Sequence, residues 1–321
     1  MLQGRFLRAW VLRLGLAAAL LSGCRGASLT PVLQASDPSA SGAREATSSD
    51  LLYVTSNNKV FVYTYPDGKL VETLGPFYAA GGPCVDAAGD VFITNLFAVS
   101  ILKFTHGATT PDAVLWDYGQ EPGSCAIDPL TGDLAVVNSV TANGGAGSIA
   151  IYHKAKGWPR YEAIGTGDDL YWFCGYDDSG NLFFDYQDRY FKFHLDEIPK
   201  GSRMPRELHL SRALSSLGAV QWDGKYMTVA DGHASQIERF RVAGSKAIVV
   251  STSHYQGENN VGYTRSWIQR PNVIVPYGPR QREVGFWLYT KGGDHFKKLS
   301  NFPGGVASGT AVSLANPPLR K

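Results

Sequence analysis

The sequence has little charge and no cluster of basic residues. Of its 321 residues only 18% are charged, and the formal net charge is +2. Arg5, Arg8 and Arg13 precede Cys24 with no acidic residue among them, so a chain that starts at Cys24 has 27 basic and 28 acidic residues. Nucleic acids and anionic bilayers attract proteins through clustered lysine and arginine. We therefore expect no nucleic acid among the partners, and no electrostatic attachment to a membrane surface.

The sequence also lacks the motifs that identify common enzymes. It contains no HExxH, no Gly-x-Ser-x-Gly, no P-loop and no dinucleotide-binding glycine pattern. The seven histidines do not assemble into a motif either. We accordingly assign no catalytic residue from the sequence.

Long apolar runs are missing as well, apart from one near the start. The run from Leu14 to Leu21 is too short to span a bilayer comfortably, but it is long enough for the core of a signal peptide. Its ending, Leu-Ser-Gly followed by Cys24, resembles the lipobox of bacterial lipoproteins. That resemblance implies cleavage after Gly23 and attachment of lipid, such as palmitate, to the Cys24 thiol. The alternative is an ordinary secretory signal peptide in which Cys24 occurs by chance.

The same resemblance bears on location and on domain boundaries. Arg25 in place of an acidic residue favours the outer membrane, or the periplasmic face, of a two-membrane bacterium. The segment after it is rich in Ala, Ser, Gly, Pro and Thr, and it cannot bury enough apolar surface to offset the entropy lost on ordering. We predict a signal peptide over 1–23, a lipidated flexible tether over 24–49, a globular body over 50–316 and a tail over 317–321.

A repeat organises the predicted body. Short β-branched and aromatic runs alternate with Gly, Asn and Asp, and no long segment has helical periodicity. An apolar residue followed three positions later by Phe or Tyr recurs six times, at intervals of 41 to 49 residues. The aromatic members, which we expect to pack between repeats, are Tyr63, Phe104, Tyr152, Phe193, Phe240 and Tyr289. A period in the forties is typical of β-propeller blades, because each four-stranded sheet must stack on its neighbours to bury its faces.

The two ends of the body predict how the ring closes. Residues 51–74 contain only the last three strands of a repeat, whereas 309–315 has the pattern of a single first strand. Joined together they complete one blade and leave no long open edge. The sequence thus predicts an all-β, six-bladed β-propeller of four-stranded antiparallel blades, closed by the C-terminal strand joining the N-terminal blade. In its order of Gly-Pro-x-x-Asp, hairpin, apolar run and Ile-x-x-Phe, the body resembles NHL-repeat and gluconolactonase-like propellers, which implies an architecture and not an activity.

Three cysteines lie in the predicted body. Cys125 and Cys174 each precede an Asp by three residues and so occupy equivalent positions on neighbouring inner strands, whereas Cys84 precedes its Asp by two. A Cys125–Cys174 disulfide is one alternative in an oxidising compartment. The sequence favours buried free thiols, because an odd number leaves one cysteine unpaired and facing inner strands often lie too far apart.

Candidate ligand-binding residues fall on one face of the predicted ring, around its axis. One residue per blade follows the second strand: Ser56, Asn95, Asn138, Asp185, Asp231 and Tyr277. Asn95, Asn138, Asp185 and Asp231 are the polar candidates. Such a ring can coordinate a hard cation through oxygen atoms, but Asn and Asp also cap turns, and we favour that interpretation. From the loops that lead into the first strands, we predict Tyr171, Trp172 and Tyr255 as ligand-binding side chains.

Three functions follow from these patterns. The first is a non-catalytic propeller scaffold at the cell envelope that binds a small ligand or an envelope protein through this face. The second is an enzymatic alternative, a calcium-dependent hydrolase similar to the lactonases of the gluconolactonase group, with Asn138, Asp185 and Asp231 as metal ligands. The glutamate of that family's Glu-Gly-Pro run is replaced here by Gly81, which weakens metal binding and water activation. The third is a rigid spacer within an envelope assembly. We predict the binding function, with calcium as the one cofactor considered.

Overall fold

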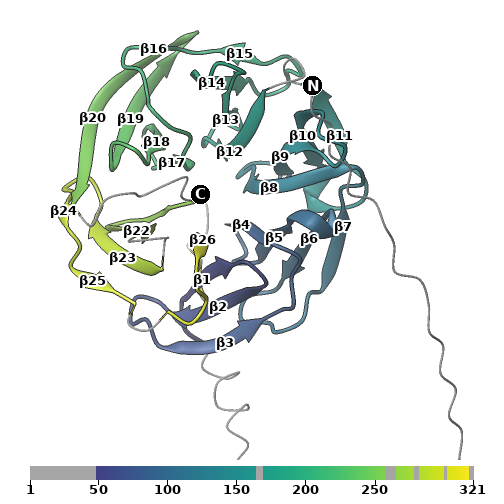
Figure 1. Ribbon diagram of the computed structural model, residues 1–321, viewed down its shortest axis with the longest axis vertical. Coiled ribbons are helices and arrows are strands. Elements are labelled where there is room, and N and C mark those ends of the chain that lie inside the picture. The colour runs from purple at the N-terminus through teal and green to yellow at the C-terminus, as the bar shows by residue number, and fades with distance from the viewer. Residues whose placement is uncertain (1–47, 164–168, 257–264, 278–281, 300–301, 318–321) are drawn as a thin grey trace, which may run out of the picture. The chain divides into compact units, whose positions relative to one another are not determined.

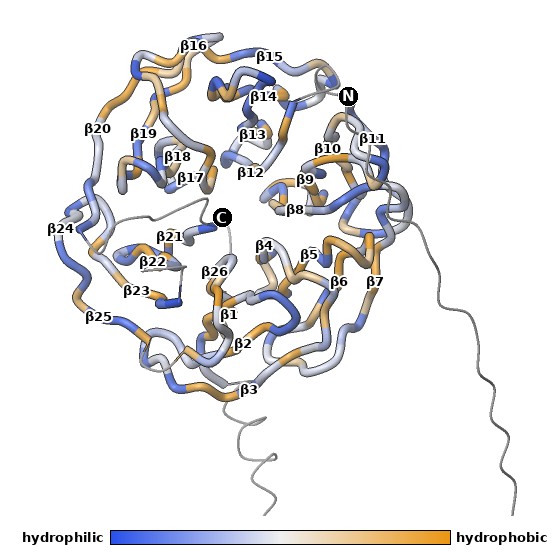
Figure 2. Tube along the Cα trace, viewed as in Figure 1, coloured by the Kyte–Doolittle hydropathy of each residue, from blue (hydrophilic) through white to orange (hydrophobic). Residues whose placement is uncertain are grey.

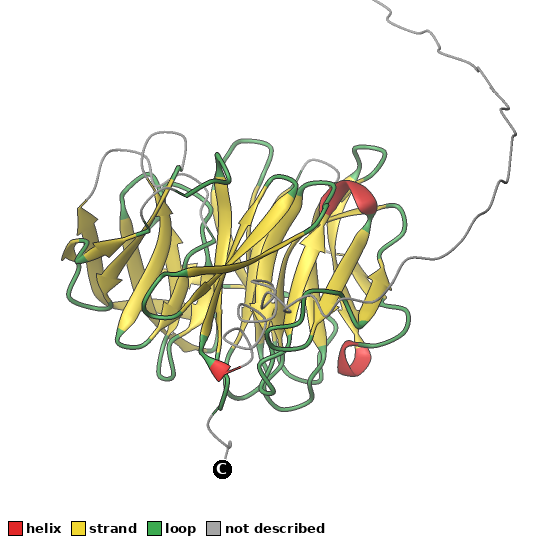
Figure 3. Ribbon diagram, turned by 90° about the horizontal axis from the view of Figure 1, so that it is seen from below, coloured by secondary structure: helices red, strands yellow, loops and turns green. Residues whose placement is uncertain are grey.

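The computed structural model describes residues 48–163, 169–256, 265–277, 282–299 and 302–317. They form six antiparallel sheets arranged in a ring (Figure 1). The named helical elements of this described part are two short 3₁₀ turns, η1 (Leu96–Ala98) and η2 (His153–Ala155). Seen from the side, the strands run between two faces made of loops (Figure 3). The predicted all-β, six-bladed propeller is confirmed.

Each blade contains four strands that follow one another from the axis outward. The first two blades are β26 (Ala307–Ser313), β1 (Leu51–Ser56), β2 (Lys59–Thr64) and β3 (Leu70–Leu74), then β4 (Ala80–Val85), β5 (Val91–Asn95), β6 (Ser100–Phe104) and β7 (Ala113–Trp116). The third and fourth are β8 (Gln120–Ile127), β9 (Leu134–Thr141), β10 (Ala146–Tyr152) and β11 (Arg160–Ala163), then β12 (Leu170–Tyr176), β13 (Leu182–Gln187), β14 (Phe193–Ile198) and β15 (Arg206–Glu207). The fifth and sixth are β17 (Val220–Trp222), β18 (Met227–Asp231), β19 (Gln236–Ala243) and β20 (Lys246–Gln256), then β21 (Trp267–Gln269), β22 (Asn272–Tyr277), β23 (Glu283–Leu288) and β25 (Lys297–Lys298). Two short strands, β16 (His209–Leu210) and β24 (Gly293–Asp294), add parallel pairs to β20.

The ring closes where the two ends of the described body pair. β26 is antiparallel to β1, with Leu51 opposite Ser313 and Tyr53 opposite Ala311. β26 therefore serves as the innermost strand of a blade whose other three strands come from the start of the body (Figure 1). The closure predicted from the sequence is confirmed.

The hydrophobic core is divided into six clusters, one at each contact between neighbouring blades. At the first contact, for example, Leu51 and Tyr53 pack with Ala80 and Val91 of the second blade. The repeated aromatic residues are all buried in these clusters, namely Tyr63, Phe104, Tyr152, Phe193, Phe240 and Tyr289. Hydrophobic segments accordingly recur in the strands of every blade (Figure 2). Each of these clusters combines residues of two neighbouring blades, so the stability of a blade depends on its neighbours.

The hairpins between first and second strands are fixed by a recurring aspartate. In four blades its Oδ1 accepts the backbone N–H two residues further on, and these aspartates are Asp86, Asp128, Asp177 and Asp223. A glycine with positive φ completes each hairpin, where a side chain would be strained: Gly89, Gly132, Gly180 and Gly224. We call the face with these hairpins the turn face. The opposite face, where loops lead into first strands and leave second strands, is the loop face.

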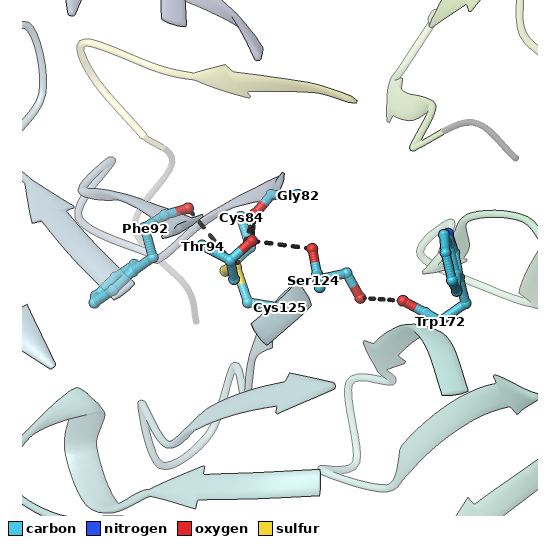
Figure 4. Close-up of a disulfide and its surroundings, with 8 residues drawn as sticks. Gly82, Cys84, Phe92, Thr94, Ser124, Cys125 and Trp172 are labelled. Carbon is cyan, nitrogen blue, oxygen red and sulfur yellow. Dashed lines mark hydrogen bonds between the residues drawn. A yellow bond between two sulfur atoms is a disulfide. The ribbon is translucent and has the colours of Figure 1, made fainter. Parts of the chain in front are cut away.

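The prediction of buried free thiols was wrong for two of the three cysteines. Cys84 of β4 and Cys125 of β8 form a disulfide with their Cα atoms 5.7 Å apart (Figure 4). For Cys174, a buried free thiol, the prediction is confirmed. Counting residues back from the turn aspartates had placed Cys84 out of level with the other two. Such a count assumes that neighbouring inner strands are level, but β4 and β8 belong to different sheets, so no backbone pairing fixes the height of one strand against the other.

Some predictions concern residues outside the described ranges. The signal peptide over 1–23, Cys24, most of the tether and residues 318–321 lie there. Among the residues that are described, no helix has the length and apolar character needed to cross a membrane.

Candidate functional site

The six inner strands surround an axial cavity of about 200 Å³. It is lined from every blade, and the inner strands that contribute are β26, β4, β8, β12, β17 and β21. At one end the cavity reaches Pro129, Asp177 and Asp178, which lie at or beside the hairpins of the turn face. The sequence had predicted binding on the loop face. The cavity instead extends to the opposite face.

Arg265 closes the other end of the cavity. Its backbone lies beside β26, where its carbonyl oxygen accepts the N–H of Thr310 at 3.0 Å. From there the side chain reaches β4, because a Cβ placed on Gly82 would lie 2.7 Å from its Cδ and 2.8 Å from its Nε. Its Nη2 lies 3.6 Å from the corresponding position on Gly123 of β8, which is opposite in the ring. The guanidinium therefore crosses the axis, in space that two glycines leave open.

The guanidinium of Arg265 has no counter-ion among the described residues. Within the described ranges it makes no hydrogen bond or ion pair, its Nε is buried, and its cationic group lies 5.6 Å from the centre of the Phe173 ring. Burial lowers the pKa of Arg265 to about 10, so the group is still charged at neutral pH. Burying a charge without a partner is costly unless another group compensates it.

Aromatic side chains form much of the remaining wall. Phe173, Tyr176, Trp222 and Trp267 all line the cavity. The indole Nε1 of Trp222 is buried without a hydrogen-bond partner, whereas that of Trp267 donates to the Gln269 side chain at 3.4 Å. Two residues that line the cavity, Trp222 and Arg265, thus each have a buried side-chain N–H without a hydrogen-bond partner among the described residues.

The wall between β4, β8 and β12 is cross-linked. The Cys84–Cys125 disulfide joins the first two strands, and Ser124 Oγ donates to the carbonyl of Trp172 at 2.8 Å (Figure 4). The Cys174 thiol also lines the cavity, and burial raises its pKa above the ordinary value, which keeps it protonated and unreactive. These links hold the wall rigid.

The polar residues predicted to surround a ligand act mainly as caps for neighbouring loops. Asn95 Oδ1 accepts the N–H of Tyr78 at 2.7 Å. The carboxylate of Asp185 accepts two buried N–H groups, from Phe173 at 2.8 Å and from Gly218 of the next blade at 3.0 Å. The bonds support the capping interpretation.

Asp231 and Asn138 are similarly buried within the blades. Asp231 accepts hydrogen bonds from the backbone and hydroxyl of Ser215, both at 2.7 Å. Asn138 donates to Ser148 at 3.1 Å, while its Oδ1 has no partner. Over the ranges that the structure describes, no three His, Cys, Asp or Glu side chains are grouped as metal ligands.

The predicted aromatic residues are mostly part of the core. Tyr171 is fully buried between the third and fourth blades, and Tyr255 is 6% exposed between the fifth and sixth. Trp172 is half-buried against the core of the fourth and fifth blades. Burial of the first two removes them from a ligand surface, since their rings are occupied by packing. The loop that leads from Tyr255 into β21 lies largely outside the described residues.

No protein-family model matches the chain, and no curated protein matches it by sequence. Solved structures do match its fold. A chain of a nidogen/laminin complex superposes with a TM-score of 0.65 at 13% identity, over 83% of this chain and 99% of that one. A protein of unknown function from Bacteroides caccae gives 0.61 at 14%, and a functionally unknown protein from Desulfotomaculum acetoxidans gives 0.55 at 10%, with the same coverage. At these identities the similarity shows the propeller fold alone.

Sequence reasoning missed Arg265 and Trp222 as site residues. Neither belongs to a motif, and Arg265 precedes its inner strand at a level where β4 and β8 carry Gly82 and Gly123. The sequence signal for this site was a large cation, Arg265, at the level where two other blades carry glycine. It becomes interpretable only when the six strands are placed around one axis.

Proposed function

We propose that this protein is an exported, lipid-anchored propeller that binds a small ligand without transforming it. The axial cavity carries this proposal, because all six blades enclose it and two of its lining residues, Trp222 and Arg265, have buried N–H groups without a partner among the described residues. Concave, largely apolar sites with a few polar groups are where proteins bind small molecules. The nidogen/laminin complex supports a binding role for this fold in general, since a chain of similar shape occurs there in a protein assembly.

The disulfide supports the exported location. Cys84 and Cys125 join two inner strands of neighbouring blades, and such bonds persist in oxidising compartments outside the cytoplasm. The lipobox-like sequence before Cys24 supports anchoring at the membrane. Metabolic labelling with palmitate tests the anchor, with Cys24→Ser as the control that should lose both the label and membrane association. A palmitate label that survives Cys24→Ser would contradict it.

Native mass spectrometry tests the binding role. The full chain with Cys24→Ser, exported but not lipidated, should retain a small molecule from the cell envelope. Ala219 directly precedes β17 and lines the cavity. Ala219→Leu should therefore fill part of the cavity and abolish that retention. Trp158→Ala is the matched control, because Trp158 is 70% exposed and lies outside the cavity. Retention that survives Ala219→Leu, or its absence from the parent chain, contradicts small-molecule binding in the cavity.

The hydrolase prediction has no specific observation in its favour. The carboxylates of Asp185 and Asp231 are already engaged by N–H and O–H donors. An uncompensated guanidinium at the axis opposes a divalent cation nearby, because like charges repel strongly where water is excluded. Lactonase activity stays a prediction of the sequence, as does the spacer role.

A further inference from the structure

We propose that the axial cavity binds a small monocarboxylate with an apolar body, and that the guanidinium of Arg265 holds its carboxylate group. This rests on the proposed function, since it names the ligand class of the same cavity. Four properties of the cavity support it: an unpaired cation, an apolar wall, a small volume and an acidic rim.

The cation requires an anion. Arg265 lines the cavity and retains some exposed surface although its Nε is buried. We infer that its remaining donors are open to a ligand in the cavity. A guanidinium presents its N–H groups as a planar fork that matches the two oxygens of a carboxylate. A ligand that supplied this group would remove the cost of the uncompensated charge. The described part of the chain supplies no carboxylate for it.

The remaining wall favours an apolar body. Trp222 and Trp267, which are half-buried, offer flat faces, and Ala219 adds aliphatic surface. The volume of about 200 Å³ is below the roughly 300 to 1,000 Å³ usual for drug-sized ligands. The cavity therefore fits a compact molecule such as an aromatic or short-chain acid.

The rim disfavours anions of higher charge. Asp177 accepts hydrogen bonds from Ser179 and Asn181, and Asp178 beside it is exposed. Two carboxylates at the opening repel phosphate and polycarboxylates more than a single carboxylate. The charge on the ligand is thus expected to be −1.

Gly82 acts as a positioning residue for the cation. A methyl group there would overlap the Cδ and Nε of Arg265, and Gly82 does not have a positive φ, so alanine strains the contact and not the backbone. Gly82→Ala should displace the guanidinium and weaken carboxylate binding. In a double-mutant cycle, Gly82→Ala should add little to Arg265→Met, because both changes act on the same contact. Fully additive losses would contradict this positioning role.

Isothermal titration calorimetry at pH 7 tests the assignment with three probes: benzoate, its neutral isostere benzamide, and inorganic phosphate. The protein is the full chain with Cys24→Ser. We expect benzoate to bind, and benzamide and phosphate to bind at least tenfold more weakly. Arg265→Met should lower benzoate affinity by about 30-fold or more and leave benzamide unchanged, since truncating one partner of a buried charge pair has effects of that order. Arg265→Lys keeps the charge but loses the planar pair of N–H donors, so its benzoate affinity should lie between those of the parent and of Arg265→Met.

Melting of the ligand-free variants separates binding from folding. Arg265→Met should melt at a higher temperature than the parent, because it removes a buried charge that has no partner. Loss of benzoate binding in a more stable variant cannot then be attributed to unfolding. Trp158→Ala should bind benzoate as the parent does.

The outcomes distinguish this inference from the proposed function. No benzoate binding by the parent, equal binding of benzamide, or tighter binding of phosphate each overturns the monocarboxylate assignment. An envelope ligand that needs the cavity but not Arg265 keeps the proposed function and overturns this inference. Benzoate binding without any retained envelope ligand supports the inference and contradicts the proposed function.

Discussion

The hydroxyl of Tyr289 donates a 2.7 Å hydrogen bond to Oδ2 of Asp223, and this bond joins the sixth blade to the fifth. The same oxygen lies 2.7 Å from Arg239 and 3.1 Å from Arg270. Burial alone raises the pKa of Asp223, but hydrogen bonds from Tyr289, from the Tyr226 N–H and from Arg239 together outweigh it, so the pKa lies below its ordinary value. A buried anion thus links two blades.

Asp223→Asn should destabilise the protein strongly. The substitution leaves Arg239, whose side chain is largely buried, without its counter-ion, and breaking such a pair costs about 3 kcal/mol or more. Urea denaturation at pH 7 measures the loss. Asp178→Asn makes the same chemical change at an exposed residue and is the control, so it should change the free energy of unfolding little. A loss no larger than that of the control would contradict the role of Asp223.

The same carboxylate predicts part of the acid sensitivity. Because its folded pKa is lowered, its contribution is present above the unfolded pKa of about 4 and is lost as the pH falls through the folded value. Unfolding of Asp223→Asn should accordingly depend less on pH below 4 than unfolding of the parent chain.

Asp117 predicts the opposite dependence at higher pH. Burial raises its pKa to about 6, although hydrogen bonds with Tyr161 and Asn138 act against the increase. Folding therefore favours the protonated form, so the contribution is present below about pH 4 and is lost as the pH rises through 6. Asp117→Asn keeps an acceptor for the Tyr161 hydroxyl and should be about 2 kcal/mol more stable than the parent at pH 7.

Chemical denaturation between pH 4 and pH 7 checks this prediction. The gain from Asp117→Asn should shrink as the pH falls toward 4. Burial raises the pKa of Asp196 to about 6 as well. Asp196 should therefore account for the pH dependence of the free energy of unfolding that persists in Asp117→Asn. A variant less stable than the parent at pH 7 would show that the Asp117 carboxylate is favourable when charged.

The disulfide should contribute measurably to stability. Cys84 and Cys125 are separated by 41 residues, and closing a loop of that length stabilises a protein by about 2 to 4 kcal/mol. Replacing both with serine should lower the free energy of unfolding by this amount, whereas Cys174→Ser tests the separate buried thiol. In the Cys24→Ser chain, thiol titration under denaturing, non-reducing conditions should find one free thiol. Three would exclude the disulfide.

Closure of the ring should depend on Val312. This side chain is 2% exposed and packs in the cluster between the sixth and first blades. Val312→Asp places an unpaired carboxylate there and should cost about 3 kcal/mol or more. Val306→Asp, on a side chain 44% exposed, is the control. Hydrogen exchange should accelerate in 51–56, the partner strand, before it does in the other blades.

The fold could be predicted because it depends on repetition. Six pairs of an apolar residue and a Phe or Tyr, at similar intervals, indicate six sheets. The repeat at 51–74 lacks a first strand, and the segment near 309–315 supplies it. Both features belong to local patterns of burial, which a sequence displays directly. The turn aspartates and their glycines were visible for the same reason.

The site could be predicted much less well. Whether Tyr171 or Tyr255 points to a ligand or into the core depends on the packing of two blades, and a pattern of aromatic residues is the same in both cases. Arg265 matters through its relation to Gly82 and Gly123, which are far from it in sequence. The pairing of Cys84 was missed because it depends on the relative height of β4 and β8, two strands of different sheets. Contacts across the axis join residues far apart in the sequence, and no repeating pattern in the sequence indicates them.

Closure by β26 also fixes where the chain leaves the propeller. Asp50 accepts the N–H of Ala315 at 2.9 Å, and Ser313 donates to the carbonyl of Gly89, in a hairpin of the turn face. Both exits are therefore on the side to which the axial cavity extends. Reporters for uptake measurements are therefore better inserted on the far side of the ring, in the tight turn of Asn57–Asn58 between β1 and β2.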